Sequence, residues 1–229
     1  MRLTNALAAP GRPRQALRRG RLVLLAGLMA GLSLWSRALD TQQFLDIAAS
    51  RSTKALNGAR ALVQLLEKAQ PLDEEARLAA VNDFYNRRIQ FRDDQEVWGV
   101  VDYWASPLET LEKGRGDCED YAIAKYFSLL ALGVEPARLR LVYVRAMLDG
   151  RPQAHMVLAY YAQPQAEPLI LDNLQPQIRP ASARADLSPV FSFNSEGLWS
   201  GVAGAPAGNP AARLSQWRDA LGKARAEGF

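Results

Sequence analysis

The sequence has few of the side chains that carry nucleophilic chemistry. Among 229 residues, the only cysteine is Cys118 and the only histidine is His155. A lone cysteine excludes a disulfide within the chain, so its thiol is free. Any reaction that needs both a thiol and an imidazole must therefore use Cys118 and His155.

Acidic side chains are absent from residues 1–38, which hold seven arginines. Without this segment the formal net charge changes from +4 to −3, so the composition gives no support to nucleic-acid binding. Arginines up to Arg21, an apolar stretch over Leu22–Trp35 and a small residue at Ala38 are typical of a signal peptide. The apolar stretch is shorter than the ~20 residues of a spanning helix, although an uncleaved signal anchor stays an alternative. We therefore expect an exported protein with one domain at 39–229 and no integral membrane part once the leader is removed.

Internal repeats are also absent, and the hydrophobic period changes once along the chain. Helical spacing comes first, and alternation typical of strands follows Gly133. This order predicts one α+β domain, with a helical N-terminal part followed by an antiparallel sheet. The expected helices are 48–69, 72–89, 118–132 and 211–226, the expected strands 139–147, 154–161, 168–172 and 191–193, with a packed irregular segment over 91–112 and a flexible link over 200–210.

Cys118 stands at the expected first turn of a helix, where the positive end of the helix dipole favours a thiolate. His155 follows the Asp149-Gly150 turn signal of a hairpin, and Asp172 ends the next expected strand. Neighbouring antiparallel strands can place the last two side chains together. This pattern predicts a cysteine nucleophile, a histidine base and an orienting carboxylate, with the Cys118 amide as an oxyanion donor. The alternatives are a buried cysteine, a structural histidine and an Asx turn.

Three carboxylates surround the expected nucleophile: Asp117, Glu119 and Asp120. They could cap the helix and complement its dipole, which is the structural interpretation. However, negative charges within one turn of a thiol oppose its ionisation, and a bound divalent cation would remove that conflict. Oxygen ligands without further histidine or cysteine suit calcium and not zinc. Further oxygen ligands could come from main-chain carbonyls or from Asp93, Asp94, Glu96 or Asp102.

The sequence from Trp98 to Ala122 resembles a known family. Trp98-Gly99, then Asp102–Pro107, and then the run Gly114-Arg115-Gly116-Asp117-Cys118-Glu119-Asp120-Tyr121-Ala122 resemble the bacterial transglutaminase-like cysteine proteinases. His155-Met156-Val157-Leu158 and Leu171-Asp172-Asn173 fall where that family has its histidine and aspartate. The resemblance covers about residues 48–199.

The resemblance implies a papain-related, transglutaminase-like core with Cys118, His155 and Asp172 as the triad. Asp117 and Glu119, with Asp120 as a further ligand, would bind a required Ca2+ ion. Family members are periplasmic thiol proteases that cut the N-terminal region of a large surface adhesin between small residues, typically Ala-Ala, and so promote biofilm dispersal. An inner-membrane cyclic di-GMP receptor sequesters them through its periplasmic domain, and Trp98 or Trp104 would contact it.

Other functions are compatible with the same three side chains. A transglutaminase transfers the acyl group to an amine instead of water, and a cell-wall peptidase or amidase would act on peptidoglycan. A non-enzymatic alternative is a calcium-gated binding module with an incidental thiol. Activity that survives replacement of Cys118 by alanine would favour the binding module, whereas incorporation of a labelled amine would favour the transglutaminase.

Overall fold

The structure is a computed structural model that describes residues 39–163, 165–201 and 206–229. The expected leader, residues 1–38, lies outside this range. Within the described residues, helices that combine the length and the apolar character needed to cross a bilayer are absent.

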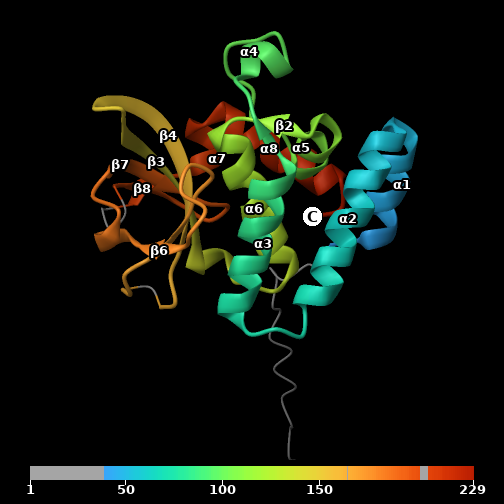
Figure 1. Ribbon diagram of the computed structural model, residues 1–229, viewed down its shortest axis with the longest axis horizontal. Helices are drawn as coiled ribbons and strands as arrows, with labels where there is room; N and C mark the ends of the chain where they lie inside the picture. The colour runs from blue at the N-terminus through green and yellow to red at the C-terminus, as the bar shows by residue number, and fades with distance from the viewer. Residues whose placement is uncertain (1–38, 164, 202–205) are drawn as a thin grey trace, which may run out of the picture. The chain divides into compact units, whose positions relative to one another are not determined.

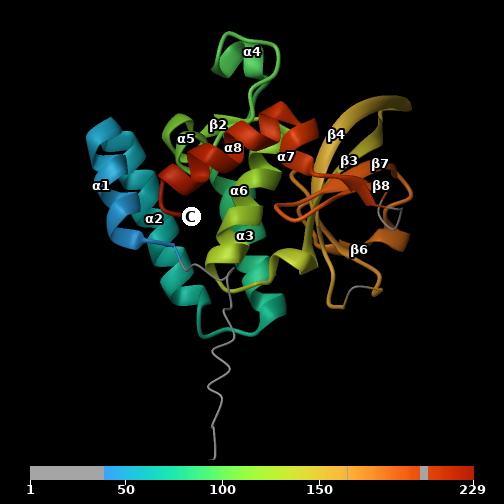
Figure 2. The ribbon, with the colours of Figure 1, turned by 180° about the vertical axis from the view of Figure 1, so that it is seen from behind.

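The helices form the N-terminal half of the described chain and return at its C-terminus (Figure 1). The view from behind in Figure 2 shows α8 running across the helical side, next to α5 and α6. The helices are α1 (Thr41–Arg51), α2 (Thr53–Ala69), α3 (Glu74–Arg88), α4 (Asp94–Val97), α5 (Pro107–Lys113), α6 (Cys118–Ala131), α7 (Pro210–Arg213) and α8 (Ser215–Ala226), with short 3-10 turns η1 (Pro136–Arg138) and η2 (Ala181–Ala183).

The other half is an antiparallel sheet whose strand order is β6-β5-β4-β3-β7-β8-β9. Its centre is the hairpin of β3 and β4, as the Asp149-Gly150 signal predicted. Both turn residues have positive φ, 51° and 74°, which is the geometry of a two-residue hairpin turn. The strands are β3 (Leu139–Leu148), β4 (Arg151–Tyr160), β5 (Leu169–Leu171), β6 (Arg179–Pro180), β7 (Leu187–Phe193), β8 (Leu198–Ser200) and β9 (Pro206–Gly208), and a separate parallel pair joins β1 (Gln90–Phe91) to β2 (Arg115–Gly116).

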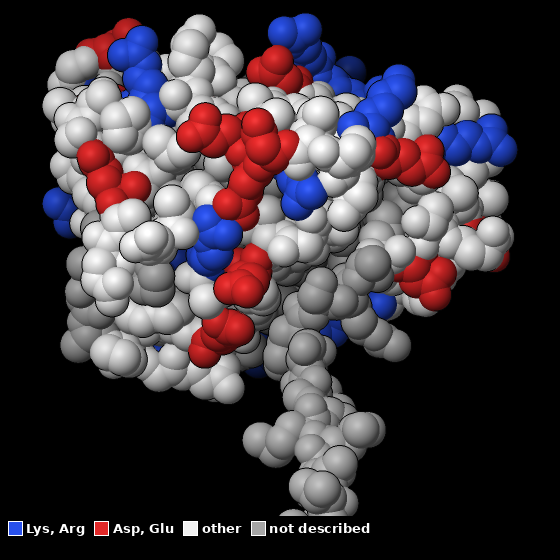
Figure 3. Space-filling model, turned by 90° about the horizontal axis from the view of Figure 1, so that it is seen from below, with Lys and Arg blue, Asp and Glu red and all other residues white. Residues whose placement is uncertain are grey.

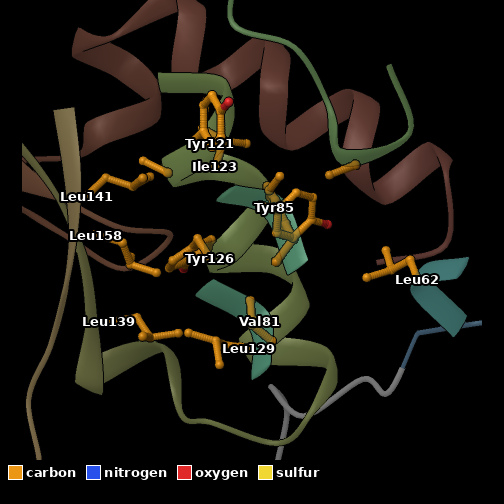
Figure 4. Packing of buried hydrophobic residues seen from close by; sticks show 14 of the residues in the cluster. Leu62, Val81, Tyr85, Tyr121, Ile123, Tyr126, Leu129, Leu139, Leu141 and Leu158 are labelled. Carbon is orange, nitrogen blue, oxygen red and sulfur yellow. The ribbon is translucent and has the colours of Figure 1, made fainter. Parts of the chain in front are cut away.

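The main core lies where α6 packs between α3 and the sheet. Leu139, Leu141 and Leu158 point from β3 and β4 toward α6, and Val81 reaches it from α3 (Figure 4). A second, smaller cluster covers the opposite face of the sheet and includes Val157. The mixed α+β architecture is therefore confirmed, and α6 carries Cys118 directly onto β4.

The first expected helix, 48–69, is wrong in its extent. The structure has two helices, because Ser52 is extended at φ −169° and its Oγ accepts from the Ala55 amide as the N-cap of α2. The irregular segment also contains α5, whose capping box joins Ser106 and Glu109. A serine with a glutamate three residues later is a readable signal for this start.

The expected link at 200–210 is also wrong in part. Pro206 pairs with Trp199, so β9 extends the sheet within this segment. The single C-terminal helix is interrupted as well, because Leu214 is extended between α7 and α8.

On the face shown in Figure 3, side chains of both charge signs lie next to one another.

Candidate functional site

Cys118 is the first residue of α6, and the preceding loop is fixed by backbone geometry. Gly114 ends α5 with φ 64°, a conformation that glycine adopts without strain. The main chain then pairs with β1 before the helix starts. Gly116 allows a close approach, because a Cβ there would lie 2.4 Å from Oδ2 of Asp120.

His155 and Asp172 lie together, as the sequence predicted from neighbouring strands. Nε2 of His155 is 2.8 Å from Oδ1 of Asp172, and both side chains are buried. The same Oδ1 accepts from the Leu174 amide at 3.0 Å, so the Asx turn considered as an alternative is present too. Because Asp172 occupies Nε2, Nδ1 is the imidazole nitrogen that remains for another partner.

The Cys118 thiol reaches the same strand. The backbone amide of Met156, one residue after His155, lies close enough to the Cys118 sulfur to oppose the rise of its pKa. The structure therefore brings the expected nucleophile to the part of β4 that carries the expected base. The N-cap residue Asp117 makes no side-chain bond to the first turn of α6, so the capping interpretation of Asp117 is wrong.

The electrostatics around Cys118 oppose a thiolate. Burial, followed by the charge of Glu119, raises the pKa of the Cys118 thiol well above its usual range. The thiol donates to Oε2 of Glu119 at 2.9 Å. The carboxylates therefore outweigh the helix dipole as long as no cation balances them.

Three carboxylates, Asp94, Asp117 and Glu119, form the acidic group beside Cys118, with one oxygen from each within 4.8 Å of the others. Burial raises the pKa of Asp94 to about 6, and burial and the neighbouring acids also raise the pKa of Asp117. Oδ1 of Asp94 and Oδ1 of Asp117 are buried and lack a hydrogen-bond partner. Unpaired buried oxygens from several acids fit a hard divalent cation.

Asp120 has a different environment from the acidic group. Its Oδ1 accepts from the Ala105 amide at 2.8 Å, so it fastens the segment before α5 to the start of α6. Its Oδ2 is buried without a partner and faces Gly116. Asp94 joins the group through Tyr103, whose amide donates to its Oδ2. Asp120 therefore stays a predicted calcium ligand. In the structure, Asp94 and not Asp120 is the third member of the acidic group.

Two cations contact Asp172 that sequence reasoning did not identify. Nη2 of Arg184 donates to its Oδ2 at 2.7 Å, and Nζ of Lys125 donates to its main-chain oxygen at 3.1 Å. Burial lowers the pKa of Lys125 to about 7. Lys125 falls seven residues after Cys118 on the same helix, a spacing that places both on one face. Arg184 had no comparable signal.

Comparisons with known proteins agree with this geometry. The model of the bacterial transglutaminase-like cysteine proteinase family matches residues 59–186. The solved structure of Legionella pneumophila LapG is 37% identical, with 80% of this chain and 97% of that chain covered at a TM-score of 0.69. Its EGTA-treated form gives 37% identity, the same coverages and a TM-score of 0.71. Its calcium-bound form gives 37% identity over 80% of this chain and 98% of that chain at 0.69. A comparison with curated proteins finds no match.

Proposed function

Because the chain belongs to the bacterial transglutaminase-like cysteine proteinases, we propose that it is a calcium-dependent periplasmic endopeptidase of the LapG type. Its substrate is the N-terminal region of a large surface adhesin, cut at a site of two small residues such as Ala-Ala. The cut releases the adhesin and promotes biofilm dispersal. Export to the periplasm rests on the leader expected at residues 1–38.

One observation carries the proposal: the backbone amide next to His155 on β4 approaches the Cys118 sulfur, and the His155 imidazole bonds to Asp172. In this assignment Nδ1 of His155 takes the proton of the Cys118 thiol, and the sulfur attacks the carbonyl carbon of the substrate. Asp172 holds the imidazole through Nε2 and stabilises its charged form. The imidazolium then protonates the leaving amine, and water hydrolyses the acyl enzyme.

The outer edge of β4 supports an extended polypeptide as substrate. The Tyr161 amide donates to the Arg138 carbonyl, and this bonded pair continues the register of β3 and β4. Because bonded and non-bonded pairs alternate in an antiparallel ladder, Ala154 and Met156 direct their peptide groups away from β3. The Met156 amide does so at Cys118.

Strand β5 covers only the Leu158–Tyr160 part of this edge. Ala154 is exposed, and its outward peptide group is paired by no strand of the described residues. A substrate strand that adds here places a peptide bond next to the Cys118 sulfur. Pro152, which has no amide hydrogen, also faces outward and ends the usable edge.

Calcium is assigned to the acidic group because its buried oxygens need a cation. Asp94, Asp117 and Glu119 would hold it, with Asp120 behind them. The bound ion would supply positive charge that offsets the carboxylates opposing the Cys118 thiolate. LapG from Legionella pneumophila has been solved in a calcium-bound form.

The receptor contact is assigned to the loop after α4. Val101 in this loop is 90% exposed, and Figure 1 shows α4 projecting from the helical side. Trp98 packs against Tyr103 at the base of this loop with the two rings tilted, whereas Trp104 stacks on the core residue Phe193. We therefore assign contact with the periplasmic domain of an inner-membrane cyclic di-GMP receptor to Trp98.

To test the proposal, purified residues 39–229 are mixed with an N-terminal fragment of an adhesin that carries an Ala-Ala site, and cleavage of the fragment is measured. Reactions contain calcium or a chelator, and Cys118→Ala is the matched inactive variant. We expect cleavage only with both calcium and Cys118. Loss of cleavage when the Ala-Ala pair of the fragment is replaced by bulky residues would confirm the requirement for small residues.

Other outcomes reject parts of the proposal separately. Equal cleavage rates with and without chelator would reject the calcium requirement while keeping the protease. Cleavage by Cys118→Ala would reject the nucleophile. A folded protein that leaves the fragment intact in every condition would reject the adhesin substrate.

A further inference from the structure

Arg184 is a buried cation behind the His155–Asp172 pair. It follows η2 and is 3% exposed. Its Nη2 donates to Oδ2 of Asp172 at 2.7 Å and to Oδ2 of Asp186 at 2.7 Å, and its Nε donates to Oδ1 of Asp186 at 2.9 Å. The side chain of Asp186 is 41% exposed. A partly exposed acid thus holds one end of a buried arginine that contacts the carboxylate of the triad.

The contacts of Asp172 divide between its two oxygens. Oδ1 accepts from His155 and from the Leu174 amide, whereas Oδ2 accepts from Arg184. Rotation of the carboxylate would break bonds on both sides. Arg184 therefore fixes the orientation in which Oδ1 faces the imidazole, since one buried oxygen without a partner would be unfavourable.

Arg184 also affects the charge that His155 experiences. The charged groups around the pair are Arg184 and Lys125 on the cationic side and Asp172 and Asp186 on the anionic side, and the Cys118 thiol lies by the neighbouring Met156 amide. An imidazolium at position 155 shares Asp172 with the guanidinium. The arginine therefore limits how strongly Asp172 holds a proton on His155.

We propose that Arg184, held by Asp186, is a positioning residue of the protease reaction that orients the Asp172 carboxylate toward His155 and shares its charge. This inference rests on the triad assigned in the proposed function. The side chain of Arg184 bonds to Asp172 and Asp186, so it acts on the reaction through Asp172.

The experiment uses the full-length chain without a histidine tag, so that His155 gives the only imidazole signal in the nuclear magnetic resonance spectrum. Arg184→Met removes the positive charge and the hydrogen bonds of the side chain. Arg184→Lys keeps the charge without the several N–H donors of the guanidinium, and Asp186→Asn weakens the ion pair that holds Arg184. Arg179→Met, at an exposed position of β6, is the matched control. Each variant is titrated by the His155 signal and assayed for kcat and KM.

We expect Arg184→Met to raise the pKa of His155 by at least half a unit, because one cation less competes for Asp172. Its kcat should fall about 10-fold to 100-fold with KM changed less than about 3-fold, since a carboxylate that still contacts His155 but is no longer fixed by Arg184 positions the base less precisely. Arg184→Lys should lower kcat with a smaller change in the His155 titration. Arg179→Met should match the wild type in both.

An Arg184→Met protein with unchanged His155 titration overturns the proposal, whether or not kcat falls, because a purely structural arginine would leave the imidazole alone. If Arg184→Met does not fold, Asp186→Asn decides, and an unchanged titration and kcat there overturn it. The spectroscopic measurement needs no substrate. A wild type that cleaves nothing therefore rejects the proposed function, while the titration still tests Arg184.

Discussion

Asp172 and the acidic group of Asp94, Asp117 and Glu119 are carboxylates of the same candidate site, yet their surroundings are opposite. Asp172 is held by His155 and Arg184, and these partners lower its pKa to about 2 despite its burial. In the acidic group burial and mutual repulsion raise the pKa of Asp94 to about 6. The protein supplies its own counterions at Asp172, whereas the described residues supply none to the acidic group.

This difference separates two uses of a buried acid. A paired carboxylate keeps a fixed orientation and charge, which an imidazole partner needs. A group of acids without counterions destabilises the fold, and a cation that binds there relieves their repulsion and so stabilises the folded state. The comparison therefore predicts that changes at Asp172 act mainly on catalysis, and that changes at the acidic group depend on calcium.

The largest effect should come from Asp172→Ala, which destroys the paired side of the comparison. We expect kcat to fall by about 10³-fold or more, because His155 loses its orienting partner. Stability should fall by about 3–5 kcal/mol, since the buried Arg184 keeps only Asp186. Steady-state kinetics and urea unfolding measure the two losses, and Asp83→Ala at an exposed position is the control. A kcat near that of the wild type would show that Asp172 has no role in the reaction.

A change of sign should distinguish the acidic group. Asp117→Asn is expected to lower Tm in calcium, where it removes a ligand, and to raise Tm in chelator, where it removes repulsion. Each shift should be about 2–4 °C, which corresponds to about 1 kcal/mol. Asp219→Asn, at an exposed position of α8, is the control and should shift neither. Thermal melts that move in the same direction in both conditions would argue against a cation at this group.

The parts of the site that sequence predicted are those encoded locally. The start of α6 at Cys118 and the Asp149-Gly150 turn depend on residues a few positions apart. Period-two spacing then fixed which face His155 shares with Val157, and that cluster is present. The contact between His155 and Asp172 could therefore be predicted from the two neighbouring strands alone, without the rest of the fold.

The parts that could not be predicted depend on distant segments. Arg184 reaches Asp172 only because β6 and η2 fold back along β5, and no local pattern marks that return. Asp94 joins Asp117 through the turn at Tyr103. The break at Ser52 resembled continuous helix because its neighbours keep helical spacing, and the N-cap preference of serine was the competing signal.

The smallest effect should come from Glu227, a third buried carboxylate that is intermediate between the two extremes. Oε1 accepts from Ser106 Oγ at 2.5 Å and lies 3.1 Å from Arg51, and Oε2 accepts from the Leu108 amide at 3.3 Å. These partners are too few to offset burial, which raises its pKa from 4.5 to about 7. The folded state therefore keeps its proton to higher pH than the unfolded state. The stability that the protonated Glu227 contributes is therefore fully present below pH 4.5, and it declines as pH rises to about 7.

Glu227→Gln should remove this decline, because an amide keeps the hydrogen-bonding shape without titrating. In saturating calcium, we expect wild type and variant to differ by less than about 1 kcal/mol at pH 5, and the variant to gain on the wild type as pH rises to 7. Urea unfolding at several pH values measures the difference. Glu167→Gln is the control, since hydrogen bonds from Ser182 lower the pKa of Glu167. Its pH dependence therefore lies below 4.5. Parallel curves for wild type and Glu227→Gln between pH 4.5 and 7 would place Glu227 with the fully paired acids, like Asp172.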